Sequence, residues 1–328
     1  MPDLNPTEAP LVSVVIPTYN RSDYLQEAIA SALGQTYTNI EVVVTDDCSP
    51  QSPEPLIRGF NDPRIRFLQN DQNLGITLNI TSGFEAAKGK YVASLNDDDR
   101  WTPDFLTRLV PHLEANPQLS VAFCDHYVID AAGEIDHQAT AQNSHEWKRD
   151  WLSEAVYQPF WHLALVDRAV SCAAAAVIRN DAIAWSELRA AGQAGMGRHW
   201  DYFLGYLACR EGHGAYFCPE YLTEYRAHTQ NITQLTNRKN NTTKINSGFS
   251  RVYCYERFLA DDRLKDLWPY FKQQLAVGKT TLGIGMLRDG KTSQARAYFW
   301  QALQQNVNLR TAAALTLSFM PSLVTSRV

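Results

Sequence analysis

The sequence predicts an α/β protein in which helices cover both faces of a largely parallel sheet. Short runs rich in valine and isoleucine alternate with segments of helical periodicity through residues 11–95. The strand runs are almost continuously apolar, which is typical of strands buried on both faces of a parallel sheet. The length of 328 residues, with 45% apolar and 20% charged residues, suggests about two globular domains.

The predicted strands and helices alternate regularly along this part of the chain. The first strand is the β-branched run 11–16, which Pro17 stops, and Ser22 is expected to cap a helix that ends near Leu33. Further strands are predicted at 40–45, 65–68 and 91–95, with helices at 55–60 and 77–87 between them. In such sheets, ligands bind beyond the carboxyl ends of the strands.

Acidic side chains follow two of these strands. Asp46 and Asp47 end the second strand, and the run 96–99, Asn-Asp-Asp-Asp, ends the fourth. Neighbouring carboxylates repel one another unless a cation offsets their charge, and oxygen ligands without cysteine suit Mg²⁺ or Mn²⁺. An isolated run of aspartates is more often a solvated turn with a helix cap. Its position at the ligand edge, beside a second acidic pair, favours a metal site.

Several function classes are excluded by charge and by missing motifs. The chain has 30 basic and 35 acidic residues and no block of like charges, which argues against a nucleic-acid-binding protein. No G-x-G-x-x-G follows the first strand, so the fingerprint of dinucleotide-binding dehydrogenases is absent from the sequence. The segment 83–90 only approximates a P-loop, because five residues separate its glycines and no Ser or Thr follows its lysine.

The termini and cysteines indicate a cytoplasmic protein. Residues 1–10 are polar, with no apolar core of an export signal, and the apolar stretch 312–324 is short and broken by Pro321. The six cysteines contain no C-x-x-C pair and are expected to be reduced and mostly buried. We expect a location in the cytoplasm, with the inner face of the plasma membrane as the alternative.

Three segments together resemble the signatures of family 2 glycosyltransferases. They are residues 13–20 (SVVIPTYN), 44–49 (VTDDCS) and 95–99 (LNDDD) followed by Trp101 and Pro103, and they match in order and spacing. The resemblance extends to about residue 233. It implies the GT-A fold, a Rossmann-like, mostly parallel sheet with flanking helices, followed here by a small helical region. It also implies a nucleotide-diphosphate-sugar donor, a divalent cation (Mn²⁺ or Mg²⁺) and inversion at the anomeric carbon.

The resemblance also assigns residues to the donor and to the metal. The donor-binding residues that it implies are Pro17, Thr18, Tyr19, Asp46, Asp47, Asn79, Asn96, Asp97 and Arg226. The metal ligands that it implies are Asp98, Asp99 and His228. The chain departs from the family pattern at Asn96, where an acid is usual, and at Ile80, where many members have arginine.

Asp201 is the implied general base. The segment 197–204 resembles the family's Glu-Asp element, with Trp200 in place of the glutamate. An acid in the first turn of a helix also has a purely structural explanation, since it interacts favourably with the helix dipole. With the family resemblance, we expect Asp201 to deprotonate the acceptor hydroxyl.

The remaining sequence suggests the domain organisation. The predicted parts are a flexible tail (1–10), a donor-binding half (11–125), an acceptor-binding half (126–235), a polar linker (236–250) and a helical region (251–328). Aromatic residues at 147, 151, 157, 160 and 161 either stack on sugars, line a lipid-linked acceptor or pack in the core. The helical region resembles one tetratricopeptide-type unit. We expect it to dock on the catalytic part, with a partner or a membrane surface as alternatives.

The sequence therefore favours an inverting glycosyltransferase that uses a nucleotide-linked sugar, with a lean to UDP. Its expected acceptor is a saccharide or a lipid-linked molecule in polysaccharide or glycolipid assembly. A non-catalytic scaffold is the first alternative, supported by Asn96 and Trp200 but opposed by Asp47, Asp98 and Asp201. A nucleotidyltransferase is the second, although a Gly-rich, basic loop would be expected where residues 17–20 stand.

Overall fold

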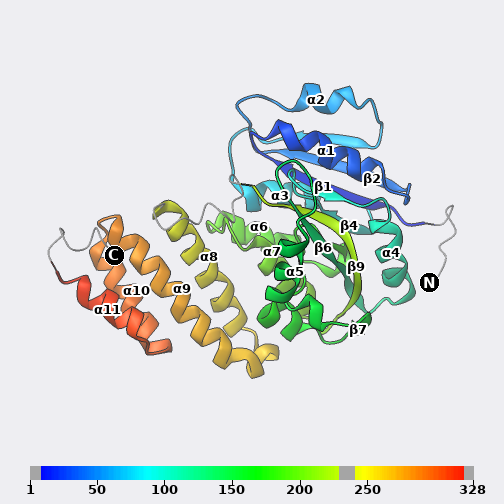
Figure 1. The fold of residues 1–328 in the computed structure, drawn as a ribbon. Coiled ribbons are helices and arrows are strands. Elements are labelled where there is room, and N and C mark those ends of the chain that lie inside the picture. Colours follow the sequence, from blue (N-terminus) through cyan, green and yellow to red (C-terminus); the bar gives the residue numbers. More distant parts are fainter. Residues whose placement is uncertain (1–8, 229–240, 321–328) are drawn as a thin grey trace. The chain divides into compact units, whose positions relative to one another are not determined.

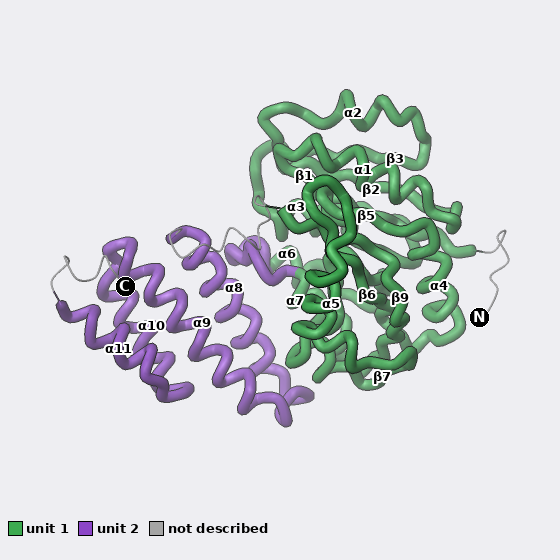
Figure 2. The backbone as a smooth tube through the Cα atoms, viewed as in Figure 1, with its two compact units in different colours: residues 1–190, 201–228 green, residues 191–200, 229–328 purple. Residues whose placement is uncertain are grey.

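The computed structural model describes residues 9–228 and 241–320, which divide into two compact units (Figure 2). Unit 1 contains residues up to 190 together with 201–228, and unit 2 contains residues 191–200 and those from 229 onward. The predicted donor and acceptor halves are not separate bodies. One strand of unit 1, Leu119–Ile129, runs across the predicted boundary at residue 125, and unit 1 joins most of both halves.

Unit 1 is built on one sheet, which has nine strands among the described residues (Figure 1). The strands are β1 (Val12–Thr18), β2 (Ile40–Asp46), β3 (Ile65–Gln69), β4 (Tyr91–Ser94), β5 (Arg100–Trp101), β6 (Leu119–Ile129), β7 (Ala155–Tyr157), β8 (Ala176–Arg179) and β9 (Gly214–Arg226). Their order is β3-β2-β1-β4-β8-β6-β9-β5, with β7 paired to β9. Strands β1 to β4 are parallel to one another, whereas β8 is antiparallel to both of its neighbours. The predicted α/β class and GT-A-like sheet are confirmed.

Helices flank this sheet and connect its strands. They are α1 (Ser22–Leu33), α2 (Glu54–Gly59), α3 (Ile76–Ala86), α4 (Phe105–Ala115) and α5 (His137–Glu146), followed by α6 (Trp185–Gln193) and α7 (Trp200–Cys209). Helix α1 begins at Ser22, so the predicted cap is the first helical residue and Arg21 holds the cap position. Every residue of β1 and β2 is buried, which explains their continuous apolar sequence.

Close packing brings α3 directly against β1. A Cβ atom on Gly83 would lie 2.3 Å from Val15 Cγ1, so only glycine fits at this point of the helix. At the carboxyl edge, the chain turns sharply through Asn20 and Cys48, which have φ of 52° and 61°. The Asn20 N–H donates to Ser49 Oγ at 2.7 Å, joining the loops that follow β1 and β2. The edge is therefore a connected set of loops.

Unit 2 is helical, as predicted for the end of the chain. Its helices are α8 (Asn241–Leu259), α9 (Trp268–Arg288), α10 (Thr292–Gln305) and α11 (Leu309–Leu317). The turn between α9 and α10 contains Gly290 with a φ of 75°, and the predicted apolar face of α10 is confirmed by the burial of Ala295, Phe299 and Ala302. Ala295 and Phe299 belong to a buried helical core that includes Ile284 and Leu287.

The predicted polar linker over 236–250 is wrong for the part that the structure describes. Residues 241–250 form the first turns of α8, and 236–240 lie outside the described residues. Helix α8 packs on α9 through small side chains. A Cβ atom on Gly248 would lie 2.6 Å from the backbone nitrogen of Leu282, and one on Gly285 would lie 2.6 Å from Ile245 Cγ1. In this first part of α8, the close contacts are made by Gly248 and Ile245, so the sequence of 241–250 is polar on average.

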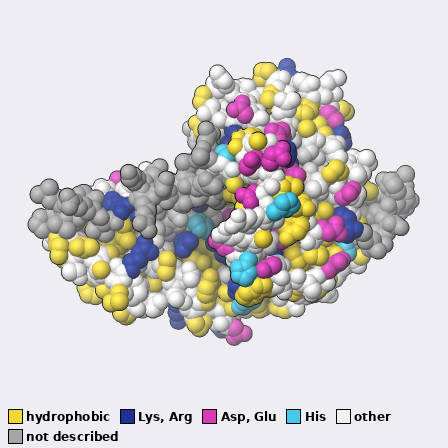
Figure 3. All heavy atoms as spheres, in the orientation of Figure 1, with side chains coloured by type: hydrophobic (Ala, Val, Ile, Leu, Met, Phe, Trp, Pro, Cys, Tyr) yellow, Lys and Arg dark blue, Asp and Glu magenta, His cyan; other side chains and the backbone are white. Residues whose placement is uncertain are grey.

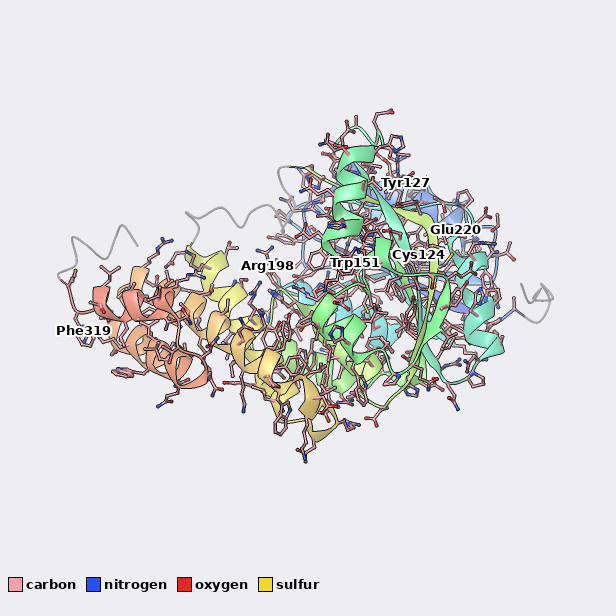
Figure 4. All side chains as sticks on the ribbon, turned by 60° about the horizontal axis from the view of Figure 1, so that its bottom comes forward. Cys124, Tyr127, Trp151, Arg198, Glu220 and Phe319 are labelled. Atoms are coloured by element: carbon pink, nitrogen blue, oxygen red, sulfur yellow. The ribbon has the colours of Figure 1, made fainter. Side chains whose placement is uncertain are left out.

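Two further expectations concern membranes and cysteines. In residues 9–228 and 241–320, none of the helices combines the length and the apolar character needed to cross a bilayer. All six cysteines fall in these ranges, none forms a disulfide, and five are buried while Cys48 is partly exposed. Cys124, for example, lies inside unit 1 (Figure 4). The thiols are free and mostly buried, as the sequence predicts.

Candidate active site

The candidate site lies where β1 and β4 end side by side. Thr18 is the last residue of β1, and Arg21 lies in the loop that follows it. Asp97 and Asp98 form the turn after β4. Thr18 Oγ1 donates to Asp97 Oδ2 at 2.7 Å. Arg21 Nη1 lies 3.1 Å from Asp97 Oδ1 and 2.6 Å from Asp98 Oδ2. The guanidinium therefore bridges two carboxylates that would otherwise repel each other.

These aspartates are withdrawn from solvent. Asp97, Asp98 and Asp99 are 7%, 9% and 1% exposed. Burial raises the pKa of Asp97 to about 7, and the charge of Asp98 adds to the rise while Arg21 opposes it. Burial, with the charge of Asp98, also raises the pKa of Asp99. Desolvated carboxylates in this arrangement favour any cation that reaches them. Figure 3 shows acidic and basic side chains gathered side by side on one face of unit 1.

His228 reaches the same carboxylate from the end of β9. Its Nε2 atom lies 3.1 Å from Asp98 Oδ2, the oxygen that Arg21 also contacts. The imidazole is 8% exposed, and its ring lies 5.1 Å from the ring of Tyr24 on α1. The structure thus brings together two of the three predicted metal ligands, Asp98 and His228.

The side chains of Asp97, Asp98 and His228 are suitable ligands for a divalent cation, although they do not form a complete coordination shell. No three carboxylate, imidazole or thiolate groups converge as a metal site within the ranges that the structure describes. Asp97 and Asp98 nevertheless present oxygens on either side of a bound cationic nitrogen, and His228 adds an imidazole nitrogen. Carboxylate oxygens with one imidazole suit Mn²⁺, and the carboxylates suit Mg²⁺. The guanidinium marks the place where such an ion fits.

Arg226 has a different position from the one predicted. Its guanidinium, 1% exposed, donates from Nε to the Asp98 carbonyl at 2.9 Å and from Nη2 to Glu27 Oε2 at 2.6 Å. It also stacks 4.5 Å from the Tyr24 ring. A side chain buried among these groups is directed into the protein, not toward a donor phosphate. These contacts give Arg226 a structural role, and its donor-binding role stays a prediction.

Asp99 and Asn96 are also used internally. One oxygen of Asp99 accepts the Arg226 N–H at 2.9 Å, and the other accepts the Asn96 side-chain amide at 2.8 Å. These bonds tie the turn after β4 to β9. Asp99 is not joined to His228 by these contacts, and Asn96 supports the turn through Asp99; their predicted roles toward metal and donor stay predictions.

Asp46, Asp47 and Asn79 hold the neighbouring loops. Asp47, 3% exposed, accepts the backbone N–H groups of Leu74 and Gly75, each at 2.8 Å. Asp46 is fully buried and accepts the amide of Gln69 at 2.9 Å and the backbone N–H of Ser49, three residues later. Asn79 donates to the Thr45 carbonyl at 3.0 Å. Buried loop N–H and C=O groups need such partners, and these side chains supply them.

Three predicted donor residues, 17–19, follow one another at the carboxyl end of β1. Pro17 is buried within β1, and its neighbour Thr18 is 3% exposed and bonded to Asp97. Tyr19, one position further, is 47% exposed. It is the predicted donor residue whose side chain is most open to a ligand.

Asp201 lies in the first turn of α7, as predicted, and is half-buried. Burial and then the charge of Asp201 raise the pKa of the Cys172 thiol, which places the carboxylate near this cysteine. Asp201 is outside the contacts that join Thr18, Arg21, Asp97 and Asp98. Its helix is anchored by buried residues such as Phe203.

The five aromatic residues at 147, 151, 157, 160 and 161 differ in how deeply they are buried. Phe160 is 1% exposed and belongs to the core, and Trp161 donates to the Cys209 carbonyl at 2.5 Å. The Arg168 guanidinium lies over the rings of Trp147 and Tyr202, 5.2 and 4.5 Å from their centroids. Trp151 is the most exposed of the group, at 66%, and Lys148 Nζ lies 5.3 Å from its ring (Figure 4).

Sequence reasoning missed Arg21, Tyr24 and Glu27. The available signal was position, because Arg21 stands three residues after a strand whose end faces the predicted acidic turn. Tyr24 and Glu27 follow at one-turn helical spacing, which places them on the same face of α1.

Comparison with known proteins identifies the family. The family described as "Glycosyl transferase family 2" matches residues 13–176, half of the chain. The chain belongs to glycosyltransferase family 2. The matched segment of this family 2 protein includes β1 and the Asp97–Asp98 turn.

Curated relatives of this family 2 protein come from several bacteria. It is 34% identical over 131 residues to a putative colanic acid biosynthesis glycosyl transferase, WcaA, of Escherichia coli, which is 39% of this chain and 46% of that protein. It is 36% identical over 124 residues to the succinoglycan biosynthesis protein ExoO of Rhizobium meliloti, 38% of this chain and 36% of that protein. The chain thus spans less than half the length of these two relatives. An uncharacterized glycosyltransferase of Haemophilus influenzae is 27% identical over 71% of both chains.

Solved structures share the fold. The crystal structure of S. aureus TarS 1-349 in complex with UDP-GlcNAc has a TM-score of 0.62 and 14% identity, over 96% of this chain and 89% of that one. The mannosyltransferase PcManGT from Pyrobaculum calidifontis, in complex with GDP-Man and Mn²⁺, has a TM-score of 0.52 and 17% identity, over 98% and 85% of the two chains. At this identity, the likeness shows the fold alone.

The structural role of Arg226 gives a testable prediction. Arg226→Met leaves the carbonyls of Asp98 and Ala131 without their buried donor and removes one of the two arginines that contact Glu27, so the free energy of unfolding should fall by about 2–3 kcal/mol. Urea denaturation measures this change. The control is Arg58→Met, which removes a 78% exposed side chain and should cost less than about 0.5 kcal/mol. A stable Arg226→Met protein that has lost nucleotide binding would contradict the structural role.

Proposed function

We propose that this protein is an inverting glycosyltransferase that moves a sugar from a nucleotide-diphosphate donor to a hydroxyl acceptor. The observation that carries the proposal is the buried pair Asp97 and Asp98, which binds a cationic group at the carboxyl edge of a parallel sheet. A family 2 segment surrounds this pair. We further propose a UDP-linked donor. The UDP-GlcNAc of the TarS structure is consistent with this choice, whereas PcManGT carries GDP-Man.

The donor would bind across the loop after β1. Tyr19 is exposed there and can cover the base or ribose, while Thr18 fixes the position of Asp97 through its 2.7 Å hydrogen bond. Asp98, with Asp97 and His228, would hold Mn²⁺ or Mg²⁺. When bound, this ion supplies positive charge that stabilises the departing nucleoside diphosphate.

Asp201 would serve as the general base. Its place in the first turn of α7 puts the carboxylate beside the partial positive charge of the helix N-terminus. As the acceptor oxygen bonds to the anomeric carbon, its proton passes to Asp201 and the bond from that carbon to the diphosphate oxygen breaks. A single displacement of this kind inverts the anomeric configuration. One base is sufficient because the leaving group needs no proton.

We propose that the acceptor is a saccharide or a lipid-linked saccharide in surface polysaccharide or glycolipid assembly. The roles for which the relatives are named, colanic acid and succinoglycan biosynthesis, support this class. Trp151 offers an exposed ring of the kind that stacks on sugars.

The end of unit 2 supports a location at a membrane surface. Residues 292–320 contain no Asp or Glu and include Arg296 and Arg310. In the same segment, Trp300, Val307 and Leu309 are 57%, 80% and 90% exposed. Phe319, 61% exposed, projects at the end of α11 (Figure 4). Exposed apolar side chains without carboxylates suit an anionic lipid surface, so we propose peripheral contact with the inner face of the plasma membrane.

The general-base role predicts the behaviour of Asp201→Asn. The variant should bind nucleotide as the wild type does, but turnover should fall by about 10²–10⁴-fold, the usual effect of losing a base. Release of UDP from UDP-sugars, with water as the acceptor, measures turnover without a known acceptor. Asp181→Asn, an exposed acid of unit 1, is the matched control and should keep full activity. Full activity in Asp201→Asn would mean that another group removes the proton.

The membrane proposal predicts binding to anionic vesicles. Sedimentation should show the protein with vesicles of phosphatidylglycerol and not with vesicles of phosphatidylcholine alone. Replacing Trp300, Val307 and Leu309 together by serine should lower partitioning by about tenfold or more, because less apolar surface is buried. The control replaces Ile135 and Val156 of unit 1, which are 40% and 47% exposed. Equal binding by the triple variant would contradict the proposed contact surface.

A further inference from the structure

The geometry points to Arg21 as an internal cation that occupies the metal position and that a divalent ion must displace. This inference rests on the proposed function, because it assumes that Asp98 binds the metal. It adds a residue to which the family resemblance gave no role. It also states a relation between two cations, the guanidinium and the metal, that compete for one pair of carboxylates.

The first argument is that one nitrogen serves both carboxylates. Arg21 Nη1 lies 3.1 Å from Asp97 Oδ1 and 2.6 Å from Asp98 Oδ2, so it stands between the two groups. The carboxylate side chains are only 9% and 12% exposed, so their charges are poorly screened by water. Without a cation between them, the two ionised groups would repel each other strongly. Arg21 supplies that cation within the chain.

The second argument is that the guanidinium and a metal need the same atom. Asp98 Oδ2 contacts Arg21 Nη1 at 2.6 Å and His228 Nε2 at 3.1 Å. Asp98 and His228 would hold the metal, and the guanidinium contacts the same Asp98 oxygen. Two cations at one oxygen repel each other in a poorly hydrated site. Binding of the metal and retention of Arg21 are therefore mutually exclusive.

The third argument is that Arg21 is able to leave. Its side chain is 19% exposed, and it belongs to the loop between β1 and α1, directly after the left-handed residue Asn20. Arg226, in contrast, is 1% exposed and bonded to two carbonyls and Glu27. Of these two arginines, Arg21 has the shorter path to solvent. After displacement it remains on the loop that carries Tyr19, at the edge where a donor diphosphate would bind.

Competition of this kind lowers the apparent affinity for metal. If the metal-accepting state, with Arg21 withdrawn, is about one tenth of the population or less, the apparent dissociation constant is raised about tenfold or more. When no metal is bound, Arg21 compensates the charges of Asp97 and Asp98, so the two carboxylates are not left without a cation. Arg21 would thus stabilise the protein in the absence of metal and make metal binding dependent on movement of the loop after β1.

The test is Mn²⁺ binding by the full chain, measured by isothermal titration calorimetry. Arg21→Gln removes the charge and should lower the Mn²⁺ dissociation constant by about tenfold or more. Arg21→Lys keeps a cation and should stay within about threefold of the wild type. Arg64→Met removes another ion pair of unit 1, with Asp62, and should leave Mn²⁺ affinity unchanged. In chelator, Arg21→Gln should melt below the wild type, and Mn²⁺ should remove the difference.

A crystal structure of the wild type grown with Mn²⁺ provides a second measurement that needs no variant. The anomalous peak should lie on Asp98, with the Arg21 guanidinium no longer in contact with that carboxylate. Equal or weaker Mn²⁺ binding by Arg21→Gln, or an Arg21 that still bridges the aspartates beside bound Mn²⁺, would overturn the inference. If neither the wild type nor Arg21→Gln binds Mn²⁺, the metal assignment in the proposed function fails instead, and this inference falls with it.

Discussion

The site depends on one electrostatic constraint, the burial of adjacent carboxylates at the carboxyl edge of the sheet. Asp97 and Asp98 are less than a tenth exposed, and two such charges coexist only when a cation compensates them. Arg21 provides this compensation directly. The surrounding contacts follow from the same need, because His228 also approaches Asp98 and Arg226 holds the Asp98 carbonyl. The turn after β4 is therefore kept ready for a positively charged partner.

Several polar side chains hold the surrounding loops in place, which makes this arrangement rigid. Asp47, Asp99 and Asn79 use their side chains to satisfy loop and strand groups that the sheet leaves unpaired. Residues of this kind hold the loops around the site in position. Tyr19 and the bridge between Arg21 and the aspartates remain at the edge as the parts open to a donor. A family signature thus contains both supporting and ligand-facing residues.

Periodicity and motif order predicted the sheet but not this division. The continuous apolar run of β1 reads directly as a buried parallel strand, and the site at its carboxyl end follows from topology. The direction of each polar side chain depends on contacts far apart in sequence. Asp99 and Arg226, separated by 127 positions, meet only because β5 and β9 pair. The helical start of α8 was hidden because glycine packing leaves no apolar periodicity to read.

The central claim is that the acidic turn binds a nucleotide through a divalent ion. The most direct measurement is the melting temperature of the wild type and of Asp98→Asn with UDP, GDP and the corresponding nucleotide sugars, each with and without Mn²⁺. A ligand that binds only the folded state raises the melting temperature. We expect the melting temperature to rise with a uridine nucleotide only when Mn²⁺ is present, and we expect no such rise in Asp98→Asn. A cooperatively melting wild type that responds to none of these ligands would contradict it.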